Sequence, residues 1–296
     1  MDFALYDVFS DGPFSGNQAA VIRSEGPLTS DKLLILAKEF NLPETCVYWM
    51  ANDVPHMTFA TSENPINTCG HGLLAVLADV VRTVGSAKSG NMCYCVETCG
   101  SGSWRFTVKG ERSMYVSVRW PKLPTLFKKL PAVETAQLLG IKVDEIRKGL
   151  PLEAFDSGII NGLVPLSDQQ QLATLKPDFG QNMKNYFAKH WLDDLELYWL
   201  AEEQVTGSSR LNVRARNIFP YGVREEGATG SASVSLAAAL FGHSERPDLH
   251  ISVTQGLSRQ GNIVARIVGR PETRAAAWLE GRVDFIASGT DLVAPG

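Results

Sequence analysis

The sequence predicts an α+β protein of two similar halves, each a β-rich barrel wrapped around a central helix. Short runs of alternating apolar residues fill much of the 296-residue chain, and most end near Gly, Pro, Asn or Asp, which is typical of strands. Two helical segments that are apolar almost all round interrupt these runs, and such helices have to be buried inside another structure. Each of them starts at a glycine-containing turn, so the two halves form a weak internal repeat.

The first half is expected to span residues 1–120. A helix over Ser30–Phe40 follows from an N-capping Ser or Asp and from apolar residues at helical spacing. A second helix, Gly70–Val84, contains the apolar run Leu73-Leu-Ala-Val-Leu-Ala78. The expected strands of this half are Phe3–Phe9, Gln18–Ile22, Cys46–Met50, His56–Thr61, Met92–Thr98, Trp104–Val108 and Met114–Trp120.

The second half is expected to span residues 121–296, after the Pro-containing linker Trp120-Pro-Lys-Leu-Pro124. Its last strand is a candidate to return to the first half. The expected helices are Thr135–Leu139, Pro165–Leu175, Gln181–Leu192 and the Ala-rich segment Thr229–Phe241. The expected strands are Glu196–Ala201, Leu211–Phe219, His250–Gln255, Asn262–Val268 and Arg282–Ile286.

Composition excludes several function classes. The net charge is −4, and no Lys/Arg run indicates a nucleic-acid or membrane partner. The acidic start MDFALYDVFSDG does not resemble a signal peptide, and no apolar stretch reaches the ~18 residues of a membrane span. Cys93, Cys95 and Cys99 lack the second ligand pair of a structural zinc site, so no metal is expected. We expect a cytoplasmic protein with reduced cysteines.

The two apolar helices also predict an anion site. The first N–H groups of a helix have no partner within the helix, and the helix dipole favours negative charge there. If the two halves face each other, the helix starts at Gly72 and at Gly230–Ser231 would line one cleft and bind an anion such as sulfate, phosphate or a carboxylate.

Several motifs, in order along the chain, resemble those of the phenazine-biosynthesis PhzF-like family. They cover the chain from the first strand to beyond residue 255, and their order and spacing make the resemblance specific. The motifs are Gly16-Asn-Gln-Ala-Ala-Val-Ile22, the helix ending in Asn41-Leu-Pro-Glu-Thr-Cys46, Glu63 with Cys69-Gly-His-Gly72, Glu225-Glu-Gly-Ala-Thr-Gly-Ser-Ala232 and Gln255-Gly256.

The resemblance implies a diaminopimelate epimerase-like fold and a cofactor-independent isomerase, in secondary metabolism if it follows the family's best-known reaction. It implies no metal, no organic cofactor and a homodimer. The substrate would be a small carboxylate-bearing molecule, moved between isomers by acid/base transfer of a proton.

Glu44 is the expected acid/base, because the family's catalytic glutamate matches this position. From the residues alone it is a carboxylate on a turn between a helix and a strand, which fits a surface charge equally well. Partial burial in a cleft would raise the pKa of a carboxyl group there and suit it to both give and take a proton.

The resemblance implies roles for further residues at both helix starts. His71 would orient the substrate or relay a proton, and Glu226 would assist in catalysis. The remaining implied substrate-binding residues are Asn17, Gly72, Thr229, Gly230 and Ser231. Local capping of the helix explains Thr229 or Ser231 as well. Glu226 stands where the family has Asp, and the loop before Gly70 is about two residues longer than usual, which leaves the substrate open.

Two alternatives stay open. Cys69 at a helix start resembles the catalytic thiol of proline racemases, and with Thr229 it would act as a hydroxy-amino-acid dehydratase or epimerase. A non-catalytic binding protein on this fold is the other alternative, since a fold does not determine a function.

Overall fold

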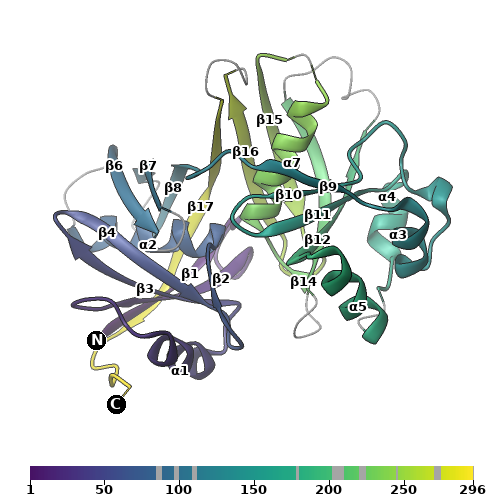
Figure 1. Ribbon diagram of the computed structural model, residues 1–296. Helices are drawn as coiled ribbons and strands as arrows, with labels where there is room; N and C mark the ends of the chain where they lie inside the picture. Colours follow the sequence, from purple (N-terminus) through teal and green to yellow (C-terminus); the bar gives the residue numbers. More distant parts are fainter. Residues whose placement is uncertain are drawn as a thin grey trace. The chain divides into compact units, whose positions relative to one another are not determined.

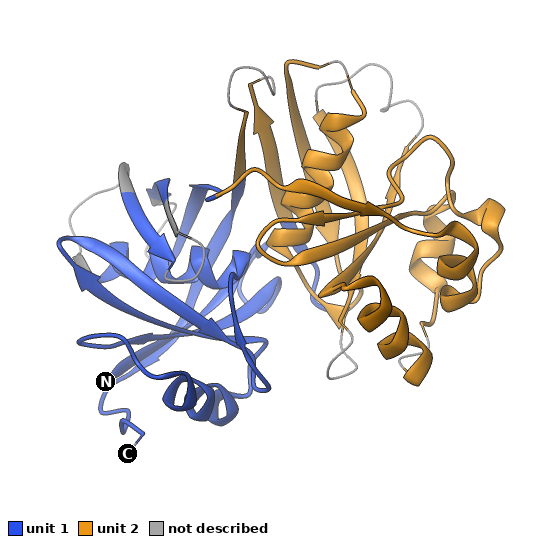
Figure 2. Cartoon of the chain, in the orientation of Figure 1, with its two compact units in different colours: residues 1–121, 259–262, 279–296 blue, residues 122–258, 263–278 orange. Residues whose placement is uncertain are grey.

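The described residues of the computed structural model form two compact units (Figure 1, Figure 2). The structure describes residues 1–84, 89–96, 100–108, 112–177, 180–201, 210–219, 225–244, 246–269 and 275–295. Unit 1 comprises Met1–Pro121, Arg259–Asn262 and Leu279–Gly296, and unit 2 comprises Lys122–Ser258 and Ile263–Trp278. The last strand of the chain therefore belongs largely to unit 1.

Unit 1 contains two helices and a set of mostly antiparallel strands. Its elements are β1 (Asp2–Val8), β2 (Asn17–Arg23), α1 (Ser30–Phe40), β3 (Glu44–Ala51), β4 (Val54–Ala60), β5 (Pro65–Ile66), α2 (Gly70–Val84), β6 (Ser89–Val96), β7 (Gly100–Val108), β8 (Ser113–Arg119) and, from residue 279 on, β17 (Ala276–Gly289).

The strands of unit 1 close into an eight-stranded barrel. Antiparallel pairs join β1 to β2, β3 to β4, β6 to β7 and β7 to β8, while β2–β3 and β4–β6 are parallel. β8 pairs with β17, and β17 runs antiparallel to β1, which returns the ladder to its first strand. Closure removes the exposed sheet edges that would otherwise pair with other chains.

Helix α2 fills the interior of this barrel. It contacts β1, β2, β3, β4 and β8, and every residue of its run Leu73–Ala78 has no exposed surface. Burial of each large apolar side chain contributes about 1.5–3 kcal/mol. As expected, the sequence of α2 is almost wholly apolar because the helix is buried inside the barrel.

One charged residue, Asp79, lies in the middle of α2 and has no exposed surface. Its carboxylate accepts hydrogen bonds from Tyr6 Oη at 2.6 Å and Tyr48 Oη at 3.0 Å. Arg23 adds two contacts, at 2.7 and 3.1 Å. Burial raises the pKa of both tyrosines, so they stay protonated and donate. Asp79 therefore ties α2 to β1, β2 and β3.

Unit 2 combines its own set of strands with four α-helices and one 3-10 helix among its described residues. Its elements are β9 (Thr125–Lys129), α3 (Ala132–Leu139), the 3-10 helix η1 (Val143–Glu145), β10 (Glu153–Asp156), β11 (Ile160–Pro165), α4 (Gln169–Thr174), α5 (Gln181–His190), β12 (Asp194–Leu200), β13 (Arg210–Ile218), β14 (Glu225–Glu226), α7 (Gly230–Gly242), β15 (Asp248–Gln255) and, from residue 263 on, β16 (Gly261–Val268).

The sheet of unit 2 encloses α7 much as the barrel of unit 1 encloses α2. β9, β10 and β11 pair antiparallel, β11–β12 is parallel, β12–β13 is antiparallel and β13–β15 is parallel. α7 contacts β9, β10, β11, β12 and β15, and all its residues from Gly230 to Phe241 are buried. Helices α3, α4 and α5 pack on a separate apolar cluster that includes Met183, Phe187 and Leu195.

Several expected elements of unit 2 need correction. The helix expected over Pro165–Leu175 is wrong at its start, because Pro165 ends β11 and Asp168 caps α4 by accepting from the N–H groups of Gln170 and Gln171. The helix expected to reach Leu192 ends at His190, where Trp191 turns into the left-handed region (φ 59°). The strands β9, β10 and β11 were not expected at all.

None of the helices among the described residues has the length and apolar composition that a bilayer span requires.

Asp79 should contribute far more to the free energy of unfolding than Asp2, which pairs with the same Arg23 but is half exposed. Asp79→Ala leaves Arg23 and two tyrosine hydroxyls without their acceptor, and we expect a loss of about 3 kcal/mol in the free energy of unfolding. The matched control is Asp2→Ala, since Asp2 lies 3.5 Å from the same Arg23 but is half exposed, and it should cost less than about 1 kcal/mol. Urea unfolding measures both, and equal losses would contradict this account.

Candidate active site

Glu44 is the first residue of β3 and lies directly after Pro43, which ends the turn from α1. It is buried, with 5% of its surface exposed, and it sits opposite Ala19 of β2 in the parallel ladder. The alternative that Glu44 is an exposed surface charge, which its residue type alone allows, is therefore wrong. A carboxyl group this buried needs a specific partner.

His71 is that partner. Its Nε2 atom lies 2.5 Å from Oε2 of Glu44, and both side chains are almost completely buried. Despite this short distance, Oε2 of Glu44 has no hydrogen bond of good alignment within the described part of the chain. Two such atoms stay this close only with a proton between them, so the carboxyl group of Glu44 and the ring of His71 form a close buried pair.

The other ring nitrogen of His71 faces two different groups. Nδ1 lies 3.2 Å from Nδ2 of Asn17 and 3.4 Å from Sγ of Cys69. An amide nitrogen only donates, so Nδ1 accepts and the ring proton of the neutral imidazole is on Nε2, directed at Glu44. Asn17 thereby fixes the tautomer that serves the carboxylate.

A tight turn holds Asn17 in place at the start of β2. Gly16 has φ +70°, and a Cβ on it would lie 2.2 Å from the carbonyl oxygen of Val8, so only glycine fits. Asp7 accepts from the N–H of Phe14 at 2.6 Å and pairs with Arg259 at 2.8 Å, which fixes the rest of the turn. The Gly16-Asn17 pair of the sequence motif is thus a backbone requirement followed by a positioning side chain.

Cys69 directly precedes α2, and its thiol caps the start of the helix. Sγ of Cys69 accepts from the N–H of Gly72 at 3.1 Å, and the carbonyl of Cys69 accepts from Leu73. A Cβ on Gly72 would lie 2.7 Å from Sγ of Cys46 and 3.0 Å from Sγ of Cys69. Glycine is therefore required between the two sulfurs. Burial raises the pKa of the Cys46 thiol, and nearby Glu44 raises it further, so Cys46 packs as a neutral thiol.

A second polar group lies at the start of α7 in unit 2. Oγ1 of Thr229 donates to Oε2 of Glu226 at 2.7 Å and accepts from Nε2 of Gln255 at 2.8 Å. Gln255 also accepts from the N–H of Thr229 at 2.9 Å and donates to the carbonyl of Glu226. One glutamine side chain thus locks the turn that leads into the helix.

The structure brings the expected site residues together within each unit. In unit 1 these are Asn17, Glu44, Cys69, His71 and Gly72. In unit 2, Glu226 and Thr229 are hydrogen-bonded, and Gly230 and Ser231 follow as the buried first turn of α7. Their roles in binding and catalysis stay predictions, as does the shared anion site.

Sequence reasoning did not assign a role to three residues at the second helix start. Gln255 was noted only as part of a motif, although it makes most of the hydrogen bonds there. Glu196 was expected only as the first residue of a strand and Asp194 lay outside it, yet both belong to β12 and neither has any exposed surface. The available signal was the acidic alternation Asp194-Leu-Glu196, which leads directly into the apolar run Leu197–Leu200.

Glu44, Cys69 and His71 are also the described residues best suited to a metal, since their ligand atoms all lie within 4.8 Å of one another. However, Glu44 lies at Nε2 of His71 and Cys69 at Nδ1. One ion binds only one of the two ring nitrogens, so these three residues do not converge on a single metal. Cys93 and Cys99 belong to the cysteine cluster in which no zinc site was expected. Cys93 is exposed, and Cys99 lies outside the described residues.

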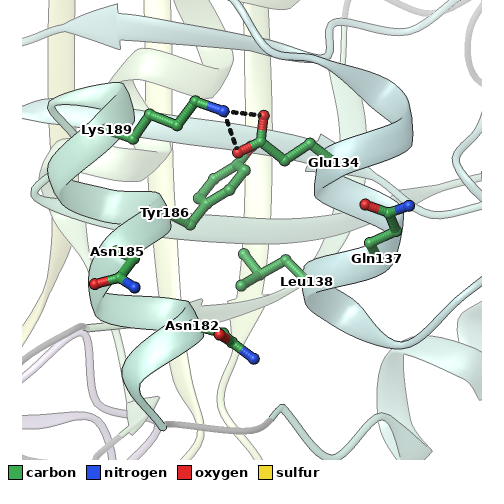
Figure 3. Close-up of a pocket in the computed structure, with 7 residues that line it drawn as sticks. All are labelled: Glu134, Gln137, Leu138, Asn182, Asn185, Tyr186 and Lys189. Atoms are coloured by element: carbon green, nitrogen blue, oxygen red, sulfur yellow. Dashed lines mark hydrogen bonds and ion pairs between the residues drawn. The ribbon is translucent and has the colours of Figure 1, made fainter.

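A pocket of about 330 Å³ lies elsewhere in unit 2, between α3 and α5 (Figure 3). The ion pair of Lys189 with Glu134, at 2.8 Å, spans it and lowers the pKa of Glu134. No expected site residue lines this pocket, whose lining is Glu134, Gln137, Leu138, Asn182, Asn185, Tyr186 and Lys189.

Comparison with known proteins gives a match along nearly the whole chain. The sequence profile of the phenazine biosynthesis-like proteins (PhzC-PhzF) matches residues 6–285. An uncharacterized isomerase of Deinococcus radiodurans is 28% identical over 275 residues, covering 88% of this chain and 82% of that protein. The trans-2,3-dihydro-3-hydroxyanthranilate isomerase of Pseudomonas aeruginosa is 25% identical over 302 residues, covering 97% and 98%.

Solved structures show the same fold. A PhzF-family protein of Bacillus anthracis has a TM-score of 0.79 at 17% identity, covering 99% of both chains. A hydroxyproline epimerase of Agrobacterium vitis has a TM-score of 0.65 at 10% identity, covering 98% of this chain and 91% of that one. The expected α+β, diaminopimelate epimerase-like fold is confirmed.

The geometry around His71 predicts that metal chelators have no effect. Dialysis against EDTA should leave the thermal unfolding midpoint unchanged, because no described side-chain group converges on one ion. Added zinc should not bind with one-to-one stoichiometry in calorimetry. Such binding, lost in Cys69→Ala or His71→Ala, would contradict this interpretation.

Proposed function

Because the chain belongs to the phenazine biosynthesis-like (PhzC-PhzF) family and is an isomerase of that kind, we propose that it moves a proton on a small carboxylate-bearing substrate, with Glu44 as acid and base. The observation that carries this proposal is the buried contact between Oε2 of Glu44 and Nε2 of His71. A carboxyl group held in this way is fixed in position and can give up or take a proton. Acid/base catalysis requires both properties.

The proposed reaction needs only side chains of this protein. The Glu44 carboxylate takes a proton from an acidic C–H of the substrate and returns it to another carbon of the same molecule. No proton or electron is gained or lost overall. His71 holds Oε2, and Asn17 keeps the ring of His71 in the required tautomer. Because Glu44 is almost fully buried, bulk water competes weakly for the proton.

We further propose that the start of α7 contributes to substrate binding. The N–H groups of Gly230 and Ser231 and the hydroxyl of Ser231 suit a carboxylate, since the first N–H groups of a helix favour negative charge. Glu226 is the proposed second proton-transfer group, placed by its bond to Thr229. A substrate resembling trans-2,3-dihydro-3-hydroxyanthranilate, which the Pseudomonas aeruginosa relative is named for, combines an acidic C–H with a carboxylate.

A second candidate function uses the thiol of Cys69. Its sulfur accepts the N–H of Gly72, which favours negative charge on it, and lies 3.4 Å from Nδ1 of His71, which in the neutral ring is an acceptor for the thiol proton. This supports epimerisation or dehydration of a hydroxy-amino acid. Against it, the hydroxyl of Thr229, the second group of that scheme, already donates to Glu226 and accepts from Gln255.

The two schemes predict opposite rankings of two variants. Glu44→Gln keeps the size of the side chain but cannot take a proton at neutral pH. It should lower the rate of proton exchange by ~10²–10⁴, which is roughly 3–5 kcal/mol of barrier. Cys69→Ala should matter far less. The measurement is deuterium wash-in from solvent into trans-2,3-dihydro-3-hydroxyanthranilate and into trans-4-hydroxy-L-proline, followed by mass spectrometry.

Loss of exchange in Cys69→Ala, with exchange retained in Glu44→Gln, would refute the Glu44 scheme and support the thiol scheme. Binding supplies the control, because Glu44→Gln should retain affinity for the carboxylate ligand whereas Ser231→Ala should weaken it. If the wild-type protein exchanges deuterium into neither compound, both proposed substrate classes are excluded.

A further inference from the structure

Unit 2 buries two carboxyl side chains without a cation beside them. Asp194 and Glu196 of β12 have no exposed surface, and they share one face of the strand because they are alternate residues. Within the described part of the chain, neither forms a salt bridge. Their side-chain partners are amides: Nδ2 of Asn161 donates to Asp194 at 2.7 Å, and Nδ2 of Asn217 donates to Glu196 at 2.9 Å.

The contact between Glu196 and Asn217 shows a mismatch that a proton resolves. Oε1 of Glu196 and Oδ1 of Asn217 are both buried and have no hydrogen-bond partner among the described residues. An ionised carboxylate only accepts, so the charged form of Glu196 leaves both oxygens unsatisfied. A proton on Oε1 turns that atom into a donor for Oδ1 of Asn217. The acid and the amide then exchange two hydrogen bonds.

Charge and burial act in the same direction. Burial, together with the charge of Glu226, raises the pKa of Glu196 to about 8 against the opposing effect of the hydrogen bond from Asn217. Burial likewise raises the pKa of Asp194 well above its usual range. Asn161 of β11 and Ser235 of α7, which also face this group, are uncharged. At neutral pH the acid form of Glu196 prevails.

Glu196 is connected to the start of α7 through the strand register. Glu196 lies directly opposite Asn217 in the ladder of β12 and β13, and Asn217 lies directly opposite Glu226 in the ladder of β13 and β14. Residues in such positions share a face of the sheet, with Cβ atoms ~5 Å apart. β14 is only two residues long, so few backbone bonds hold Glu226, and side chains beside it decide its place.

We propose that Glu196 is a positioning residue: as a neutral acid it pairs with the Asn217 amide, and this pair places Glu226 beside Thr229 at the start of α7. The inference deepens the proposed function and rests on it only where it concerns catalysis. An ionised Glu196 keeps the bond from Nδ2 of Asn217 but loses the one to Oδ1, and it puts a second negative charge next to Glu226, close to the start of α7 where the substrate carboxylate is proposed to bind. Binding of the substrate carboxylate at the start of α7 therefore weakens at alkaline pH.

The protonation state is tested by the pH dependence of stability, which needs no substrate. The folded protein holds a proton on Glu196 between the ordinary pKa of 4.5 and about 8, whereas the unfolded chain releases it. This group therefore makes the wild-type protein less stable as pH rises through that window, by about tenfold in the unfolding equilibrium constant per pH unit. Glu196→Gln keeps both hydrogen bonds to Asn217 without a titrating group.

The expected result is that Glu196→Gln gains stability over the wild-type protein from pH 5 to pH 8, with no further gain above pH 8. Glu153→Gln is the matched control, since Glu153 is also buried in unit 2 but lies 3.2 Å from His243. That variant should not show the same gain. A stability difference between wild type and Glu196→Gln that is independent of pH would mean that Glu196 is ionised when folded, and would overturn the proposal.

The positioning role is tested by NMR and kinetics. The backbone amide of Thr229 should shift with a midpoint near pH 8 in the wild-type protein and not in Glu196→Gln. A Thr229 amide that ignores this titration would refute the positioning role even if Glu196 is neutral. In deuterium exchange, the alkaline limb of kcat/KM should move to higher pH in Glu196→Gln. An absence of exchange would count against the proposed function alone, because the stability and NMR results do not depend on turnover.

Discussion

A helix enclosed by strands has to satisfy its first N–H groups without help from bulk water, and both candidate sites follow from this constraint. α2 and α7 are each buried within the sheet of their own unit. At the start of α2 the thiol of Cys69 accepts an N–H, and at the start of α7 the side chain of Gln255 accepts another. The polar groups gathered for this purpose give each helix start a polar environment inside the protein, and side chains such as Glu44 and Glu226 lie next to them.

The two units handle buried carboxyl groups in opposite ways. Asp79 in unit 1 is held as an anion by Arg23 and two tyrosine hydroxyls, so its charge is balanced by a fixed cation. Glu196 in unit 2 has amide partners and no cation among the described residues, so its balance comes from a proton. Because a bound proton balances Glu196, unit 2 responds to changes of pH at this point.

The sequence predicts the fold class and the two central helices well, and it fails where local pattern is weak. Ser30–Phe40 is a helix with the expected bounds, because its apolar spacing is a local signal, although Thr29 caps it and not the expected Ser or Asp. β10 and β11 were missed because each is a run of at most six residues whose strand character depends on neighbours far along the chain. The contact between Glu44 and His71 could be proposed only from a family resemblance, since no local signal joins residues on β3 and α2. The neutral state of Glu196 could not be predicted at all, because burial and the absence of a cation are properties of the assembled sheet.

The route of the chain through unit 1 has a consequence for biosynthesis. β1, near the N-terminus, pairs with β17, so the barrel closes with residues 283–289 against residues 3–8. On the ribosome, the first strand is made long before its partner, and one edge of the nascent barrel stays open until the rest of the chain, including all of unit 2, has emerged. Throughout that interval β1 and β8 are unpaired along one side. Chaperones therefore have most to protect while the first half of the chain has been synthesised and β17 has not.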